Sequence, residues 1–167
     1  MSKINTALIA KVGVLSALGV LAITVLRIPG PGGKVFFHLG ETVIISAAVL
    51  LGKKGGAFVG AVSSAIADML LGAPLWAPFS FLIHGVEGYV IGDLSDGSCG
   101  KQDVIAMLCG IVIMIAGYTV VAGFLYGAAI MPVEFVGDSL QGSFGIATAY
   151  PFLRFVRYRF PDINGYR

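Results

Sequence analysis

Charged residues are scarce in this sequence. Only 12% of its 167 residues are Asp, Glu, Lys or Arg, against roughly 25% in an average soluble domain. Hydrophobic residues make up 57%, and the mean hydropathy is +0.92. A soluble chain of this composition would have too little polar surface to face water. The sequence therefore predicts one integral membrane domain over residues 1–167, with no room for a soluble catalytic domain beside it.

Several chemical signatures are also missing. The two cysteines, Cys99 and Cys109, lack metal-ligand spacing, which favours two free thiols. The segment 30–34 resembles a phosphate loop, but it lacks the full pattern and follows no strand. Motifs of zinc proteases and serine hydrolases do not occur, and no cleavable signal peptide is expected. We therefore expect no catalytic residues, no cofactor and no ATP hydrolysis by this chain alone, and no nucleic-acid partner.

Long apolar runs are what the sequence has in abundance. A spanning helix needs about 20 apolar residues, or fewer where the bilayer thins. Backbone groups inside a bilayer must be satisfied within the segment, so each run should be helical. The sequence predicts an all-α integral membrane protein with six transmembrane helices, at about 6–28, 37–52, 57–71, 77–94, 104–126 and 133–156.

The distribution of Lys and Arg predicts the orientation. Cytoplasmic loops of membrane proteins carry an excess of these residues. With both termini inside, only Arg27 and Lys34 lie outside, and nine of the eleven basic residues lie inside. These nine are Lys3, Lys11, Lys53, Lys54, Lys101, Arg154, Arg157, Arg159 and Arg167.

Ionisable residues interrupt the apolar runs between residues 36 and 94. They are His38, Glu41, Asp68, His84 and Glu87. An ionisable group at membrane depth costs several kcal/mol unless it is paired or hydrated, so each is a candidate functional residue. The polar side chains fall in the outer half of the predicted spans, whereas the inner half is almost purely apolar. This asymmetry predicts a cup that opens outward, because a channel would show polar lining through both halves.

The spacing of the polar residues supports such a cup. Residues at i, i+4 and i+7 share one face of a helix. Ser80, His84 and Glu87 have this spacing, and so does a set on the last predicted helix that contains Asp138 and Gln141. Together with nearby aromatic rings, they would suit a planar heterocycle that stacks and accepts a few hydrogen bonds. The candidate substrate-binding residues are His38, Glu41, Trp76, Ser80, His84, Glu87, Tyr118, Asp138 and Gln141.

Other interpretations of these residues remain open. His84 and Glu87 would also serve as a buried pair that holds helices together, and Trp76 as an interfacial anchor. Two His-x-x-Glu pairs, at His38–Glu41 and His84–Glu87, suggest a metal-binding membrane protein or a membrane enzyme. Their order is the reverse of the usual Glu-x-x-His and only two helices carry it, so we expect no metal. A structural membrane subunit without a ligand is a third possibility.

Several short motifs along the chain resemble the substrate-binding (S) component of energy-coupling factor (ECF) vitamin transporters. The resemblance covers nearly the whole chain, and it is nearest to the branch assigned to hydroxymethylpyrimidine or pyridoxine, with riboflavin carriers as relatives. The motifs are Phe37-His38-Leu39-Gly40, Leu51-Gly52-Lys53-Lys54-Gly55-Gly56, the stretch from Ala67-Asp68 to Pro78-Phe79, and Leu140-Gln141-Gly142.

The resemblance implies a mechanism that composition does not show. An S component binds its vitamin from outside, in a pocket formed by the fourth to sixth helices and the loop after the first. Its partners are a transmembrane coupling protein and two cytosolic ATPases in a prokaryotic cell membrane, and toppling in the bilayer carries the site inward. The family's Ala-x-x-x-Ala docking motif corresponds here to Gly13 and Ala17, a small-residue pair that permits close helix approach.

Overall fold

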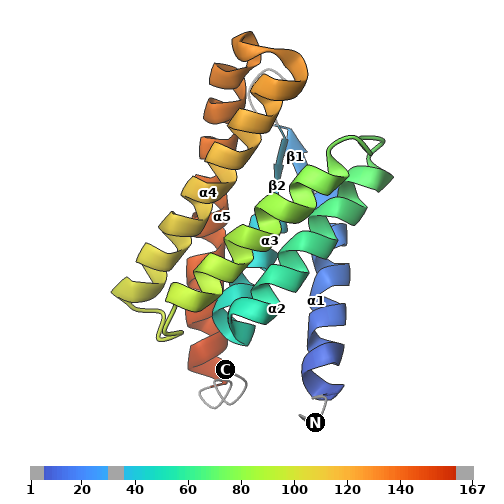
Figure 1. Ribbon diagram of the computed structural model, residues 1–167. Helices are drawn as coiled ribbons and strands as arrows, with labels where there is room; N and C mark the ends of the chain where they lie inside the picture. Colours follow the sequence, from blue (N-terminus) through green and yellow to red (C-terminus); the bar gives the residue numbers. More distant parts are fainter. Residues whose placement is uncertain (1–5, 30–35, 161–167) are drawn as a thin grey trace.

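The computed structural model describes residues 6–29 and 36–160. Residues 30–35, which include the phosphate-loop-like segment and most of the loop expected to border the pocket, lie outside the described part, as do Lys3 and Arg167. The described chain is helical apart from one small hairpin and the connections (Figure 1). Its elements are α1 (Thr6–Thr24), β1 (Arg27–Pro29), β2 (Phe36–His38), α2 (Gly40–Leu70), α3 (Ala77–Leu94), α4 (Lys101–Tyr126), the short 3₁₀ helix η2 (Ala128–Ile130) and α5 (Met131–Arg159).

Helix α2 contains two of the expected spans. Gly52 interrupts it with φ +73° and ψ −175°, a backbone conformation that essentially only glycine adopts. A Cβ on Gly60 would lie 3.3 Å from Cγ2 of Ile44, and a Cβ on Gly56 would lie 2.6 Å from Cα of Ala48. A straight helix would hold residues 44 and 60 about 24 Å apart. The chain therefore reverses at Gly52, and the two halves of α2 pack antiparallel (Figure 1).

The hairpin between α1 and α2 corrects two expected helix boundaries. Helix α1 ends at Thr24 rather than near residue 28, and α2 begins at Gly40 rather than near residue 37. Strands β1 and β2 pair antiparallel, with Arg27 opposite His38. The residue before a proline is disfavoured in helical geometry, which explains the extended backbone at Ile28 before Pro29. His38 therefore lies in a strand and not in the first turn of a helix.

Helix α4 begins at Lys101, three residues earlier than expected, because Asp103 organises the preceding loop. Its buried carboxylate accepts backbone N–H groups from Gly97 at 2.9 Å and Cys99 at 2.6 Å, and the hydroxyl of Ser95 donates to it as well. Cys99 and Cys109 are both free thiols, as predicted. Burial raises the pKa of the Cys99 thiol, which lowers its reactivity.

Helix α5 is longer than expected, at Met131–Arg159 in place of about 133–156. Proline is tolerated in the first helical turn, so Pro132 does not delay the start. The main core lies between α2, α3, α4 and α5. Its fully buried members include Ile45, Val49, Ile91, Met107 and Leu153.

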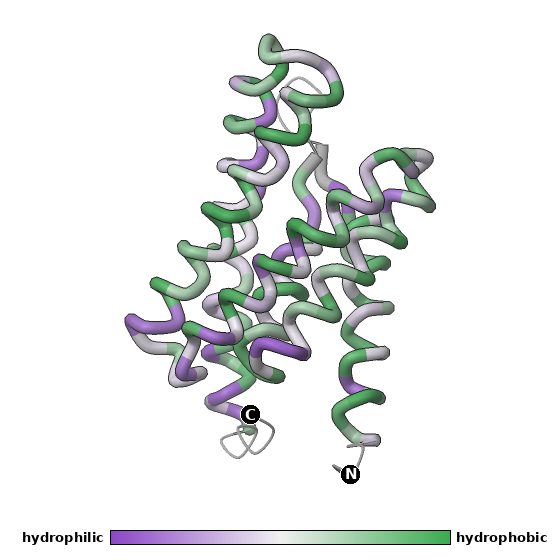
Figure 2. Tube along the Cα trace, in the orientation of Figure 1, coloured by the Kyte–Doolittle hydropathy of each residue, from purple (hydrophilic) through white to green (hydrophobic). Residues whose placement is uncertain are grey.

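Helix α1 stands at the edge of the bundle and packs mainly on α2 (Figure 1). Only Ser16, Gly19, Ala22 and Ile23 of this helix are buried. Helices α1 and α4 are long and apolar enough to cross a membrane, whereas α2 reaches that length only as the sum of its two antiparallel halves. Figure 2 shows apolar residues on each described helix, interrupted by hydrophilic ones. The start of α1, the turn at Gly52 and the end of α5 share one end of the molecule, as the predicted orientation requires (Figure 1).

Candidate functional site

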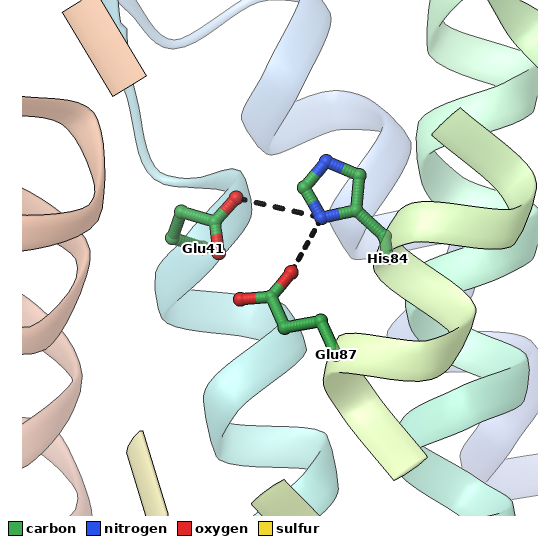
Figure 3. A group of neighbouring side chains, drawn as sticks. All are labelled: Glu41, His84 and Glu87. Carbon is green, nitrogen blue, oxygen red and sulfur yellow. Dashed lines mark hydrogen bonds and ion pairs between the residues drawn. The ribbon is translucent and has the colours of Figure 1, made fainter. Parts of the chain in front are cut away.

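Glu41, His84 and Glu87 meet between α2 and α3. Glu41 lies in the first turn of α2, and the other two residues lie one turn apart on α3. Nδ1 of His84 is 2.6 Å from Oε2 of Glu87 and 3.7 Å from Oε1 of Glu41 (Figure 3). The imidazole thus lies between two carboxyl groups from different helices.

These three side chains are withdrawn from solvent. The exposed fractions of the residues are 1% for Glu41, 0% for Glu87 and 7% for His84. Oε2 of Glu41 and Oε1 of Glu87 are buried and have no hydrogen-bond donor among the described residues. Burying such oxygens is costly unless they are paired. A proton shared between the two carboxyl groups, or donors on a bound molecule, would satisfy them.

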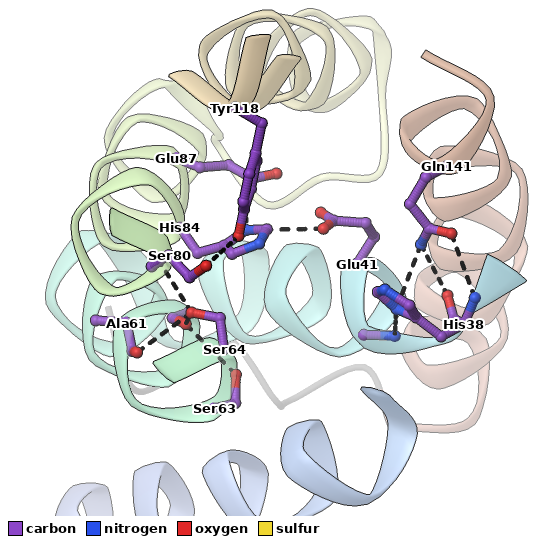
Figure 4. A network of polar contacts seen from close by, with 12 residues as sticks. His38, Glu41, Ala61, Ser63, Ser64, Ser80, His84, Glu87, Tyr118 and Gln141 are labelled. Carbon is purple, nitrogen blue, oxygen red and sulfur yellow. Dashed lines mark hydrogen bonds and ion pairs between the residues drawn. The ribbon is translucent and has the colours of Figure 1, made fainter. Parts of the chain in front are cut away.

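A second polar layer joins α3 to α4 and to the second half of α2. The Tyr118 hydroxyl donates to Oγ of Ser80 at 2.6 Å, and Oγ of Ser64 donates to the Ser80 carbonyl at 3.0 Å (Figure 4). The ring of Tyr118 lies 5.4 Å from that of His84. Tyr118 therefore places an aromatic ring and a hydroxyl next to His84, close to the carboxyl groups of Glu41 and Glu87.

Trp76 extends this aromatic wall at the start of α3. Its ring centroid lies 5.6 Å from that of Tyr118 and 6.0 Å from that of Tyr126. The indole N–H donates to the Tyr126 hydroxyl at 3.0 Å. Trp76 therefore packs on Tyr118 beside the candidate site, and its part in ligand binding stays a prediction.

His38 and Gln141 bond to each other rather than to the three buried residues. The backbone N–H of His38 donates to Oε1 of Gln141 at 3.2 Å, and Nε2 of Gln141 donates to the His38 carbonyl at 2.9 Å (Figure 4). The Gln141 amide thereby pairs with β2 as a neighbouring strand would and ties the hairpin to α5. Phe37 and Phe144 support this joint with ring centroids 5.6 Å apart.

Two further acids face the same region. Asp138 on α5 is close enough to Glu41 for their charges to interact, and its Oδ2 is buried without a donor among the described residues. Asp68, in the second half of α2, interacts with Ser80 and His84. Asp68 was predicted as a candidate functional residue but not as a substrate-binding one, and Ser64 was in neither set. Their i, i+4 spacing on one helix face was the available signal.

The metal interpretation takes a different form from the one predicted. The two His-x-x-Glu pairs do not come together, because His38 bonds to Gln141. Instead, ligand atoms of Glu41, His84 and Glu87 lie within 4.8 Å of one another, which would give a cation three ligands. In this arrangement Nδ1 of His84 is already engaged by Glu87.

Comparison with known families identifies the chain. The model of the family described as "ECF-type riboflavin transporter, S component" matches residues 3–158. The chain belongs to the S-component family of ECF transporters. This S component is accordingly a transport subunit and not an enzyme, and it is a multi-pass protein of the cell membrane. The predicted family and the all-helical membrane fold are confirmed, whereas the number of six spans stays a prediction.

Two curated proteins are similar to this chain in sequence. The S component is 37% identical over 121 residues to an "Uncharacterized protein in gap 3'region" of Pyrococcus woesei, covering 72% of this chain and 81% of the relative. It is 30% identical over 100 residues to the "Thiamine precursor transporter HmpT" of Lactococcus lactis subsp. cremoris, covering 60% of this chain. The match spans about half of HmpT's own length, 56%.

Proposed function

We propose that this S component captures a small, water-soluble vitamin precursor from outside the cell, with hydroxymethylpyrimidine as the first candidate and pyridoxine as the second. It would deliver this ligand through an ECF module of one transmembrane coupling protein and two cytosolic ATPases. ATP would be consumed by those partners. The proposed ligand site comprises the carboxyl groups of Glu41 and Glu87, His84 and the ring of Tyr118.

The buried oxygens of Glu41 and Glu87 carry the substrate proposal. Carboxylate oxygens accept hydrogen bonds, so the complementary ligand presents N–H or O–H donors at this point. Hydroxymethylpyrimidine has an exocyclic amine beside a basic ring nitrogen, and its hydroxymethyl group adds one more donor. The aromatic faces of Tyr118 and Trp76 would stack on its planar ring. The likeness to HmpT, whose name describes a thiamine precursor transporter, agrees with this choice.

Riboflavin fits the carboxyl groups of Glu41 and Glu87 less well, although the matching family is described by that vitamin. A flavin ring places one N–H between two carbonyl groups on its polar edge. Two carboxyl groups facing those carbonyl oxygens would leave acceptors opposed to acceptors, an unfavourable arrangement in a buried site. Pyridoxine offers hydroxyl donors and a basic ring nitrogen, but no exocyclic amine, which places it second.

Thermal unfolding of the detergent-purified chain tests the proposal. The ligands are hydroxymethylpyrimidine, its analogue with a carbonyl in place of the amine, pyridoxine, riboflavin, nickel and cobalt. A ligand present at 100 times its Kd stabilises the folded state by about 2.7 kcal/mol. We expect the largest rise in Tm with hydroxymethylpyrimidine and little with the analogue.

Each other outcome has a definite meaning. A larger rise in Tm with riboflavin would mean that riboflavin is the substrate, and the protein would still be a vitamin carrier. A shift with a metal alone would favour the cation site at Glu41, His84 and Glu87. The absence of any shift would contradict the proposed function.

A further inference from the structure

Each of the three buried site residues packs against a glycine from another part of the bundle. Glu41 on α2 meets Gly145 of α5, and Glu87 on α3 meets Gly110 of α4. The backbone of His84 on α3 meets Gly60, in the second half of α2. These contacts lie directly behind the groups that would hold the ligand.

Gly145 has the most selective contact of the three. If a Cβ were added to Gly145, the three nearest atoms would all belong to Glu41, with Cγ at 3.1 Å and Cβ nearer still. A methyl group at this position would therefore displace the stem of Glu41. The displacement would be passed to its carboxyl group, because the side chain is fully buried and has no solvent to move into.

Gly110 and Gly60 play similar parts for the other two residues. A Cβ on Gly110 would press first on Cγ1 and Cδ1 of Ile91, and it would lie 3.3 Å from Cγ of Glu87. A Cβ on Gly60 would lie 3.0 Å from the carbonyl carbon of His84. Glycine in a helix interior costs about 1 kcal/mol relative to alanine, so three such glycines behind one site need a packing reason.

We infer that Gly145, Gly110 and Gly60 are positioning residues for ligand binding: they allow α5, α4 and α2 to approach closely enough to place Glu41, Glu87 and His84 around one point. A binding site needs its polar groups held to within about 0.5 Å of the productive geometry. The inference rests on the proposed ligand site, and it adds residues that touch no ligand themselves.

The same helices provide matched controls. Gly142 lies on α5 three residues before Gly145, and a Cβ there would press on the side chains of Ile111 and Met114 in the apolar core. Gly117 lies on α4, and a Cβ there would press on Ile83. Alanine would crowd the packing as severely at Gly142 as at Gly145, and less severely at Gly117 than at Gly110, and neither control position has a site residue among its nearest contacts.

The experiment compares Gly145→Ala with Gly142→Ala in the full-length detergent-purified chain. Binding of hydroxymethylpyrimidine and thermal stability are both measured. We expect Gly145→Ala to weaken affinity about tenfold or more and Gly142→Ala less than about threefold, because only the former misplaces a carboxyl group that would hydrogen-bond the ligand. Both variants should lose comparable stability, which separates positioning from general packing.

A double variant tests whether Gly145 acts through Glu41. In a Glu41→Gln background the side chain keeps its volume but loses its carboxylate, so adding Gly145→Ala should reduce affinity little further while still lowering Tm. An equal loss of affinity in Gly142→Ala, or an undiminished effect in the Glu41→Gln background, would overturn the inference alone. Failure of the unmodified chain to bind the probe would remove the proposed function and this inference with it.

If Gly145→Ala does not fold, the pair Gly110→Ala and Gly117→Ala repeats the comparison on α4. Here Gly110→Ala should reduce affinity through Glu87, and Gly117→Ala should change mainly stability. Equal affinity losses in this pair would contradict the positioning role.

Discussion

Glu87 shows most clearly how a single residue links burial to recognition. One of its oxygens, Oε2, shares a hydrogen bond with Nδ1 of His84 at 2.6 Å, and the other has no donor among the described residues. A carboxyl group this deep is stable only with compensating protons or donors. The oxygen bonded to His84 keeps the side chain in place, and the other oxygen can share a proton with Glu41 or accept a hydrogen bond from a ligand.

Glu87→Gln tests this residue directly. The amide keeps the size of the side chain, but one oxygen acceptor becomes an N–H donor. A buried polar group that loses its partner costs about 1–3 kcal/mol, so we expect hydroxymethylpyrimidine to bind roughly 10- to 100-fold more weakly. Isothermal titration measures the affinity and a thermal scan confirms folding.

The control for this variant is Asp93→Asn. Asp93 forms an exposed ion pair with Lys53 at 2.7 Å, at the end of the molecule away from the site. Exposed ion pairs contribute little to stability, so we expect Asp93→Asn to leave both stability and ligand affinity nearly unchanged. Normal binding by Glu87→Gln would show that the assigned site is wrong.

At the scale of elements, the reversal at Gly52 determines which side chains face the site. The first half of α2, residues 40–51, is only about 18 Å long. Glu41 lies at its beginning, beside α3, and the chain reverses at its end. The second half returns along α3, where Gly60 touches the backbone of His84. One glycine thus allows a single stretch of chain to approach the site twice.

Gly52→Ala should destabilise this reversal. A side chain at φ +73° and ψ −175° costs about 1–3 kcal/mol. There is no other atom within 4 Å of a Cβ built there, so the cost belongs to the backbone alone. Gly13→Ala is the matched control, since a Cβ there also meets nothing within 4 Å and Gly13 lies in a regular helix. Equal Tm values for the two variants would contradict this account.

The sequence predicted the elements better than their contacts. Apolar runs and Gly-rich breaks indicate helices because backbone groups in lipid have few alternatives. The β1–β2 hairpin escaped prediction because three-residue strands leave no periodicity to read. The bonds between His38 and Gln141 join residues 103 positions apart. Hydropathy places both at the outer end of the protein, but it does not give the rotation of each helix that decides their partners.

At the scale of the whole molecule, α1 has an exposed face. Gly13 and Ala17 lie one turn apart on α1, and both are exposed. An apolar groove of about 380 Å³ borders Gly13, lined by Leu8, Ile9, Val12, Gly13, Lys54, Gly55 and Phe58. This face is consistent with the docking role that the S-component family assigns to the first helix, which stays a prediction for this chain.

Gly13→Leu separates docking from ligand capture. Since a Cβ at this position meets nothing within 4 Å, we expect normal folding and normal ligand affinity in the isolated chain. Uptake in cells that contain the complete ECF module should be lost, because the added side chain prevents close helix approach. Val112→Leu on α4, where the side chain is also exposed, is the control that should transport normally. Undiminished uptake by Gly13→Leu would exclude a docking role for this surface.

The position of Trp76 makes the protein its own optical reporter. It is the single tryptophan of the chain, and its indole lies against Tyr118 at the edge of the proposed site. A heterocycle stacked on this wall would change the surroundings of that indole, whose emission can be excited apart from that of the tyrosines. Emission from the unlabelled S component therefore reads occupancy of one molecular location, in detergent or in a lipid vesicle.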